Sequence, residues 1–247
     1  MQHYRTIYKI SAAGLALALF AAFSGPVLAQ KVPVGQASSI VRTVEGAYES
    51  DVRQLAVASQ VFQNENVSAK TASAAKIRFA DDTVLTIGPD STLTLDAFVY
   101  DPAAKNSKMV LNSALGVARF VTGRMGSPAY QIKTPTATIG VRGTILIVSV
   151  GKLGETNVIT ENGVAVVTGA SGNPVDVPAG MWSNVPPGGD PSGPAPPDPE
   201  VEAGVAEMDV TLLLGGGEDR DNDGISDDAL QALLDDIRGL RDAGCGC

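Results

Sequence analysis

The 247-residue chain carries 18 Lys and Arg against 27 Asp and Glu, and its single histidine is His3. Residues 186–247 hold three Arg and fifteen acids, whereas residues 30–185 are nearly neutral, so nothing here would neutralise the phosphates of a nucleic acid. The only histidine lies near the N-terminus and both cysteines lie at the extreme C-terminus. Catalytic triads, Cys–His pairs and His-ligated zinc are therefore excluded from the main body. We therefore expect a protein that is not an enzyme.

Residues 1–29 have the pattern of a secretory signal peptide. Arg5 and Lys9 give a positive start, residues 11–23 are apolar, and cleavage is predicted after Ala29. The apolar core is short for a membrane span. We expect a bacterial protein that is periplasmic or secreted, with no membrane span after cleavage. An uncleaved N-terminal anchor is the alternative.

Residues 30–185 show many short segments of alternating polarity. Residues 76–79, 83–87 and 91–95 alternate with the period of a β-strand, and turn residues recur about every ten positions. This pattern predicts a mainly β fold, an antiparallel β-sandwich or jelly-roll-like domain, with a β-solenoid-like fold as the alternative. Asn162-Gly163 between two apolar runs predicts a β-hairpin, because both residues accept positive φ.

The segment Thr134–Thr144 combines backbone-breaking residues with a lone cation. Pro135 fixes φ and removes a donor, while Gly140 and Gly143 flank Arg142. We expect a bend here, followed by a strand over residues 145–148 that is covered on both faces. Valine at position 143 is predicted to unfold the domain. Arg142 either binds an anion or partner, or ties neighbouring strands through carbonyls or a carboxylate.

Residues 186–199 are rich in Pro and Gly and predict a linker. Beyond it, residues 200–247 form an acidic tail whose apolar residues are spaced as on two helices. The first helix would present Val201, Val205, Met208 and Leu212, and the second Leu230, Leu233, Leu234, Ile237 and Leu240. We expect a small helix–loop–helix segment.

Between these two stripes lies an acidic loop that resembles an EF-hand, dockerin or thrombospondin type 3 calcium loop. Its expected ligands alternate along the chain, as calcium sites require, and Gly224 permits the sharp turn. The ligands would be the side chains of Asp219, Asp221, Asp223 and Asp227 and the carbonyl of Ile225. Leu230 stands where a bidentate acid belongs, and Asp228 is a possible substitute. The alternative is a solvated acidic turn without calcium.

Cys245 and Cys247 close the chain with one glycine between them. In an oxidising compartment they would form a tight internal bridge or link two chains into a dimer.

Five segments of the main body resemble the FecR domain family. The most specific is Thr134–Thr144, which is close to the family's T-P-x-A-x-x-G-V-R-G-T signature, with Thr134, Pro135, Gly140, Arg142, Gly143 and Thr144 as its motif residues. The others are 80–88, 91–95, a G-x-x-R-F-x-x-G segment at 116–123, and 175–180. Asp82 departs from the family, which usually has glycine there.

This resemblance implies an all-β domain that makes protein–protein or envelope contacts and has no catalytic activity. We expect an exported FecR-like module for interaction or signalling, with an unidentified envelope or extracellular protein as partner. A calcium-stabilised surface or matrix protein is the second hypothesis. Some family members relay iron-siderophore signals to a sigma factor. We place that role last, because it needs a cytoplasmic segment and a spanning helix, and only a short stretch precedes the apolar core.

Overall fold

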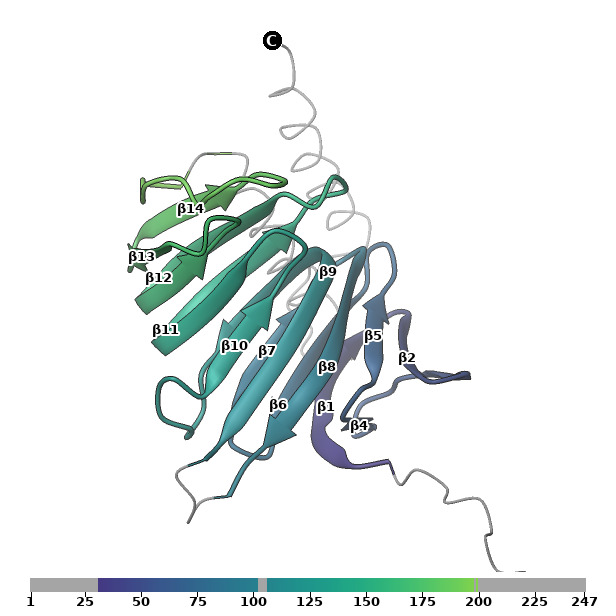
Figure 1. Cartoon of the computed structure of the whole chain (residues 1–247). Coiled ribbons are helices and arrows are strands. Elements are labelled where there is room, and N and C mark those ends of the chain that lie inside the picture. The colour runs from purple at the N-terminus through teal and green to yellow at the C-terminus, as the bar shows by residue number, and fades with distance from the viewer. Residues whose placement is uncertain (1–30, 102–105, 198, 200–247) are drawn as a thin grey trace, which may run out of the picture. The chain divides into compact units, whose positions relative to one another are not determined.

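The computed structural model describes residues 31–101, 106–197 and 199. They form fourteen strands connected in one sheet (Figure 1). The predicted signal peptide, the acidic tail with its calcium loop, and both cysteines lie outside the described residues. None of the described residues forms a helix of the length and apolarity that a membrane crossing requires.

The strand pairings divide this sheet into two layers that share three long strands. The first layer runs, in order of pairing, through β4 (Gln60–Phe62), β1 (Pro33–Val41), β6 (Ala74–Phe79), β7 (Val84–Ile87), the second halves of β9 (Lys108–Val121) and β11 (Thr138–Val150), the first half of β12 (Thr156–Thr168), and β14 (Met181–Val185).

The second layer contains the remaining strands and the other halves of the shared ones. Its order is β3 (Asp51–Gln54), β2 (Val44–Tyr48), β5 (Asn66–Ala69), β8 (Ser91–Val99), the first half of β9, β10 (Tyr130–Lys133), the first half of β11, the second half of β12, and β13 (Pro174–Pro178). The β9–β10 pair is parallel and every other named strand pair is antiparallel.

The long strands pass between the layers at opposite ends. Gly116, where β9 enters the first layer, lies opposite Val150 at the end of β11. In contrast, Ile145, where β11 enters the first layer, lies opposite Val121 at the end of β9. The connection through β9 is therefore at one end of the sandwich, and the connection through β11 and β12 is at the other.

The core lies between the two layers and follows from the alternation within each strand. In β6, Ala75, Ile77 and Phe79 are buried while Lys76 and Arg78 are exposed. Aromatic rings meet across the core: Phe120 of the first layer and Tyr130 of the second have centroids 5.6 Å apart in an edge-to-face arrangement. The mainly β, sandwich-like prediction is confirmed, as an open mixed sheet folded on itself. The described strands do not form a solenoid.

The hairpin predicted at Asn162-Gly163 is wrong. β12 is one continuous strand from Thr156 to Thr168, and both of its halves pair with β11 instead of with each other. The positive φ of Gly163, 77°, serves a bend within the strand and not a chain reversal. Part of the predicted linker also belongs to the sheet edge, because Ala195 pairs with Trp182 of β14 through hydrogen bonds of 2.8 and 3.1 Å.

Candidate functional site

Two strands bend together where they pass between the layers. β11 bends at Gly143, which has a φ of 57°, and its register with β12 shifts between Arg142 and Leu146. Gly163 of β12 lies opposite this bend. We call Arg142, Gly143, Thr144, Asn162 and Gly163 the β11–β12 bend. It is the bend that the sequence predicted, built from two strands and not one.

Thr144 holds the bend in place. It is 1% exposed, and its hydroxyl donates toward the carbonyl oxygens of Arg142 and Val164, at 2.8 and 3.1 Å. Its amide donates to Oγ1 of Thr122, at 3.1 Å, and its carbonyl accepts from the amide of Thr122, at 3.2 Å. One buried threonine thus connects β11 to β12 and to the chain that leaves β9. These bonds satisfy backbone groups that the register shift would otherwise leave unpaired.

The first part of the signature forms the turn that precedes β11. The hydroxyl of Thr134 accepts from the amide of Ala137, at 2.9 Å, and receives a second hydrogen bond from Oγ1 of Thr156, at 2.7 Å. Pro135 lies in this turn, next to Gly154. Gly140, however, is an ordinary strand position opposite Val166, outside the bend. The signature residues therefore serve two separate local structures.

Arg142 is the exposed cation of the bend. Its backbone pairs with Val164, and within the described part of the chain its side chain has neither an ion pair nor a hydrogen bond. The interstrand tie considered from the sequence is therefore not present among these residues. The arginine that does tie strands is Arg119, whose Nε and Nη2 donate to Oε2 of Glu161 at 2.9 and 2.7 Å, across β11. Arg142 remains available for a contact outside the domain.

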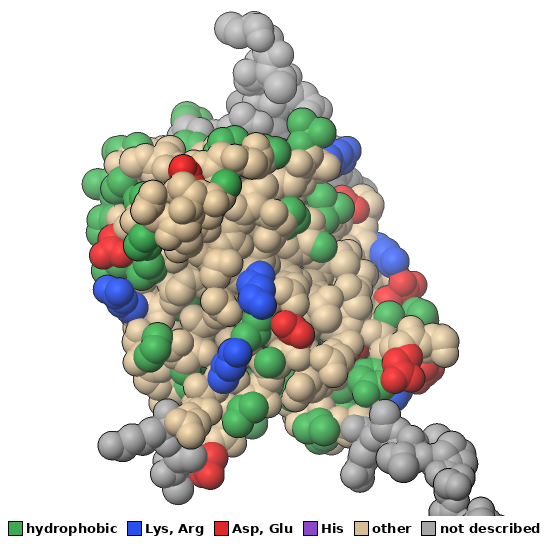
Figure 2. Space-filling model, viewed as in Figure 1, with side chains coloured by type: hydrophobic (Ala, Val, Ile, Leu, Met, Phe, Trp, Pro, Cys, Tyr) green, Lys and Arg blue, Asp and Glu red, His purple; other side chains and the backbone are tan. Residues whose placement is uncertain are grey.

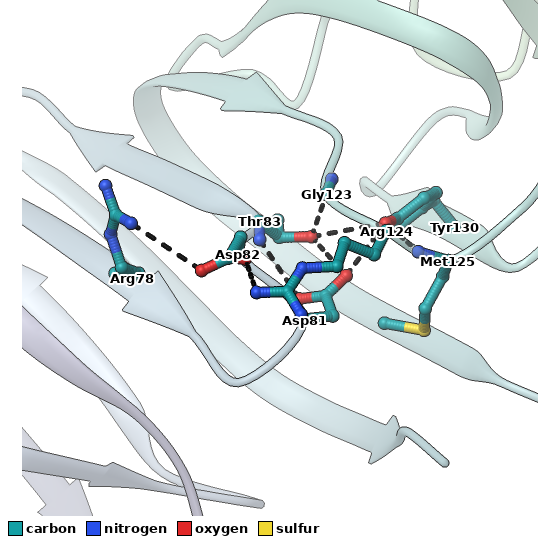
Figure 3. A network of polar contacts seen from close by, with 8 residues as sticks. All are labelled: Arg78, Asp81, Asp82, Thr83, Gly123, Arg124, Met125 and Tyr130. Carbon is teal, nitrogen blue, oxygen red and sulfur yellow. Dashed lines mark hydrogen bonds and ion pairs between the residues drawn. The ribbon is translucent and has the colours of Figure 1, made fainter. Parts of the chain in front are cut away.

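A buried polar network joins the layers elsewhere (Figure 3). We call Asp81, Thr83, Gly123, Met125 and Tyr130 the Asp81 network. The carboxylate of Asp81, fully buried, accepts from the hydroxyls of Thr83 and Tyr130, at 2.6 and 2.8 Å, and from the amide of Thr83, at 3.1 Å. The amides of Gly123 and Met125 donate to the hydroxyls of Thr83 and Tyr130, at 3.1 and 3.0 Å.

The network links the β6–β7 turn of the first layer to the β9–β10 connection and to β10 of the second. Burial, together with the carboxylate of Asp81, raises the pKa of Tyr130 to about 12. Tyr130 is therefore a protonated donor at neutral pH, which is the role that the buried carboxylate needs. A side chain at Gly123 would place Cβ 2.2 Å from the carbonyl oxygen of Asp81, so glycine is required for this close approach.

Asp82 covers the same turn from the solvent side. Its φ is 65°, in the left-handed region that favours glycine but accepts aspartate, which explains the departure noted in the sequence. Its carboxylate pairs with Arg124 and lies 3.6 Å from Arg78. These exposed ion pairs contribute little to stability compared with the buried network below them.

The sequence motifs contained Asp81, Thr83 and Gly123 but gave no indication that they meet Tyr130. The tyrosine lies 49 residues from Asp81 along the chain, and no local pattern marks it. A second buried carboxylate, Glu65, accepts from Nη2 of Arg53 and the amide of Phe62, at 2.7 and 2.9 Å. It was also missed, and here too its partners are defined by the fold.

The described residues enclose a small cavity in the core. None of them forms a group of three His, Cys, Asp or Glu side chains that would hold a metal ion. A cavity between the layers has a volume of about 10 Å³, enough for a single water, and is lined by Leu85, Leu93, Leu111, Ser113, Ala118, Phe120, Ile132 and Val148. Figure 2 shows one face of the molecule, on which cationic and anionic side chains are scattered without a broad area of one sign.

Comparisons with known proteins find two similar solved structures and one matching family model. Two crystal structures of a "putative anti-sigma factor" from Parabacteroides distasonis, at 2.50 and 1.65 Å resolution, each resemble the chain with a TM-score of 0.47 at 13% identity. The matches cover 71% of this chain and 90% and 91% of those chains. No curated protein matches the sequence. Residues 65–170 match the family model described as FecR protein, so the segment from β5 to β12, with the β11–β12 bend and the Asp81 network, is FecR-like.

Proposed function

We propose that this protein is an exported FecR-like module without catalytic activity, which acts through protein–protein contacts in the cell envelope as part of a signalling system. The observation that carries the proposal is the FecR match over residues 65–170, which contain the β11–β12 bend and the Asp81 network.

Arg142 is the contact residue that we assign to this function. Its backbone is fixed by pairing with Val164 and by the hydroxyl of Thr144, while its guanidinium lies free of the described residues. A guanidinium held on a rigid bend is suited to bidentate binding of a carboxylate. The partner would therefore present an acidic side chain or a C-terminal carboxylate to the bend.

The test compares charge reversals in the full chain. Arg142→Glu and Lys133→Glu each replace an exposed cation of the second layer by an acid, and Lys133 on β10 lies away from the bend. Affinity capture from envelope fractions should recover a protein with the unmodified chain and with Lys133→Glu, but not with Arg142→Glu. Equal thermal unfolding of the three chains would show that all are folded. Equal capture by all three would contradict the assignment of Arg142.

Export is tested separately. Cell fractionation followed by mass spectrometry should find the chain in the periplasm or medium, with Gln30 as its first residue. Retention of the full-length chain in the inner membrane would mean that residues 1–29 remain as an anchor, and it would overturn the exported form of the proposal.

A second candidate function is supported by the acidic loop of the tail. We propose that this loop binds calcium through the side chains of Asp219, Asp221, Asp223 and Asp227 and the carbonyl of Ile225. Asp228 lies near position twelve of the loop, where Leu230 replaces the usual acidic ligand. The protein would then be a calcium-stabilised surface or matrix protein. Titration of the full chain with calcium should release heat in a calorimeter and increase the helical signal in circular dichroism. Asp221→Asn should weaken both effects. A flat titration would remove this candidate.

A further inference from the structure

A row of cross-strand partners crosses the outer face of the first layer. Residues directly opposite each other in a sheet share a face. Successive pairs connect six of them across β6, β7, β9, β11, β12 and β14: Lys76, Thr86, Arg119, Ile147, Ile159 and Trp182. Their sequence neighbours Leu85, Phe120, Leu146 and Val158 belong to the core between the layers. The row therefore points away from that core.

The centre of this row is nevertheless buried. Ile147 is 2% exposed, Thr86 is 4% exposed and Ile159 is 8% exposed. Ile147 and Ile159 are not part of the core cluster between the layers. All the strands described belong to one of the two layers, so no described strand lies over this outer face. The described strands thus do not account for the low exposure of these two isoleucines, which, with the single tryptophan of the chain, mark an apolar face whose cover lies outside the two layers.

The part of the chain that follows the described residues starts next to this row. Ala195 pairs with Trp182, at the β14 end of the row. Val201 is six positions after Ala195, and an extended chain of six steps spans up to about 20 Å. The segment 201–212 therefore starts within reach of the face.

We propose that residues 201–212 form a helix that packs across this face, with Val201, Val205, Met208 and Leu212 against Ile159, Ile147 and the ring of Trp182. Twelve helical residues measure about 18 Å. Three strand spacings, from β14 through β12 and β11 to β9, measure about 14 Å. The helix thus matches the apolar part of the row in length. Its acidic residues, Glu202, Glu207 and Asp209, suit the exposed cation Lys76 farther along the row, whereas Arg119 is already paired with Glu161.

Trp182 supplies the first measurement, because it is the only tryptophan and lies in the row. In the full chain, Val205→Asp with Met208→Asp should shift Trp182 emission to the red and raise its quenching by acrylamide severalfold. The matched control is Ala203→Asp with Ala206→Asp, which adds the same charge to the opposite face of the helix and should leave both signals unchanged. Identical signals from both double variants would overturn the proposal.

A second measurement changes only one of the four apolar residues of the proposed helix. In the full chain with Cys245→Ser and Cys247→Ser, a bimane label on Met208→Cys should be quenched by Trp182, and quenching should disappear in Trp182→Phe. Quenching that persists on dilution supports a cover from the same chain. Loss on dilution would assign the face to a second copy, and quenching of a label on Leu234→Cys but not on Met208→Cys would assign it to the other apolar stripe. Either result would overturn the proposal.

Discussion

The two layers are joined in two physically different ways within the FecR-like segment. At the β11–β12 bend the backbone itself passes between the layers, and two glycines provide the conformation. At the Asp81 network the β9–β10 connection also crosses between the layers, but here buried polar side chains form the link. The β11–β12 bend therefore depends on the free space around its glycines and on their positive φ, and neither changes with pH. The Asp81 network depends on hydrogen bonds to its buried polar atoms and on the phenol proton of Tyr130.

The largest effect should come from filling the space at the bend. In Gly163→Val, Cβ would lie 2.5 Å from the carbonyl oxygen of Gly143 and 2.8 Å from that of Arg142, at a φ of 77°. Clash and backbone strain together should lower the free energy of unfolding by at least about 3 kcal/mol. Urea unfolding of the full chain measures this loss.

Gly172→Val is the matched control for crowding. Gly172 has a φ of 78°, and its added Cβ would have no atom within 4 Å. It should therefore cost only the strain of the left-handed backbone, about 1–2 kcal/mol. Equal losses at positions 163 and 172 would show that φ alone, and not the close contact between β11 and β12, decides how the bend tolerates substitution.

The Asp81 network should respond next, in a way that the bend cannot. Tyr130→Phe removes the hydroxyl that donates to Asp81 and accepts from the amide of Met125. Both buried groups lose a partner, so the free energy of unfolding at pH 7 should fall by about 1–3 kcal/mol. Chemical unfolding by urea, followed through circular dichroism, would measure the difference. A neutral result would mean that water replaces the hydroxyl.

The same variant has a pH signature. The pKa of Tyr130 in the folded protein, about 12, is above its ordinary value of 10.0, so the folded state holds this proton more tightly. The stabilisation is complete below pH 10 and is lost as pH rises through 12. The stability difference between the unmodified chain and Tyr130→Phe should therefore narrow between pH 10 and 12. The loss of unfolding free energy caused by Gly143→Ala should stay constant between pH 10 and 12.

Gly143 gives a smaller effect than the sequence predicted. From the sequence alone, valine at this position was expected to unfold the domain. The structure leaves no atom within 4 Å of an added Cβ, and only the φ of 57° opposes a side chain. Gly143→Val should stay folded and lose about 1–2 kcal/mol, as measured by thermal and urea unfolding. An unfolded Gly143→Val would show that the two sides of the bend are equally constrained.

The sequence predicted features that depend on local pattern. Alternation at 76–79, 83–87 and 91–95 corresponds to β6, β7 and the first half of β8, because one side of each strand faces the core. The glycine at 143 indicated a bend for the reason seen in the structure, a positive φ. These features follow from side-chain period and backbone conformation, which are properties of a few consecutive residues.

Features that depend on distant partners were not predictable in this way. Asn162-Gly163 has the composition of a hairpin turn, but pairing of both flanking segments with β11 outweighs the local preference. The partners of Asp81 and Glu65 come together only when the layers stack, as the 49-residue separation of Asp81 and Tyr130 shows. A buried carboxylate has no signature in a single sequence until the fold defines what surrounds it.

The smallest effect should come from the ion pair beside the bend. Arg119 and Glu161 connect β9 to β12 across β11, but their side chains are 33% and 32% exposed. Water and salt screen such a pair, so a double-mutant cycle with Arg119→Ala and Glu161→Ala should give a coupling below about 1 kcal/mol, decreasing as salt rises. A larger coupling that persists at high salt would mean that charge helps to hold the β11–β12 bend. The contrast between a junction made by backbone and a junction made by polar side chains would then no longer hold.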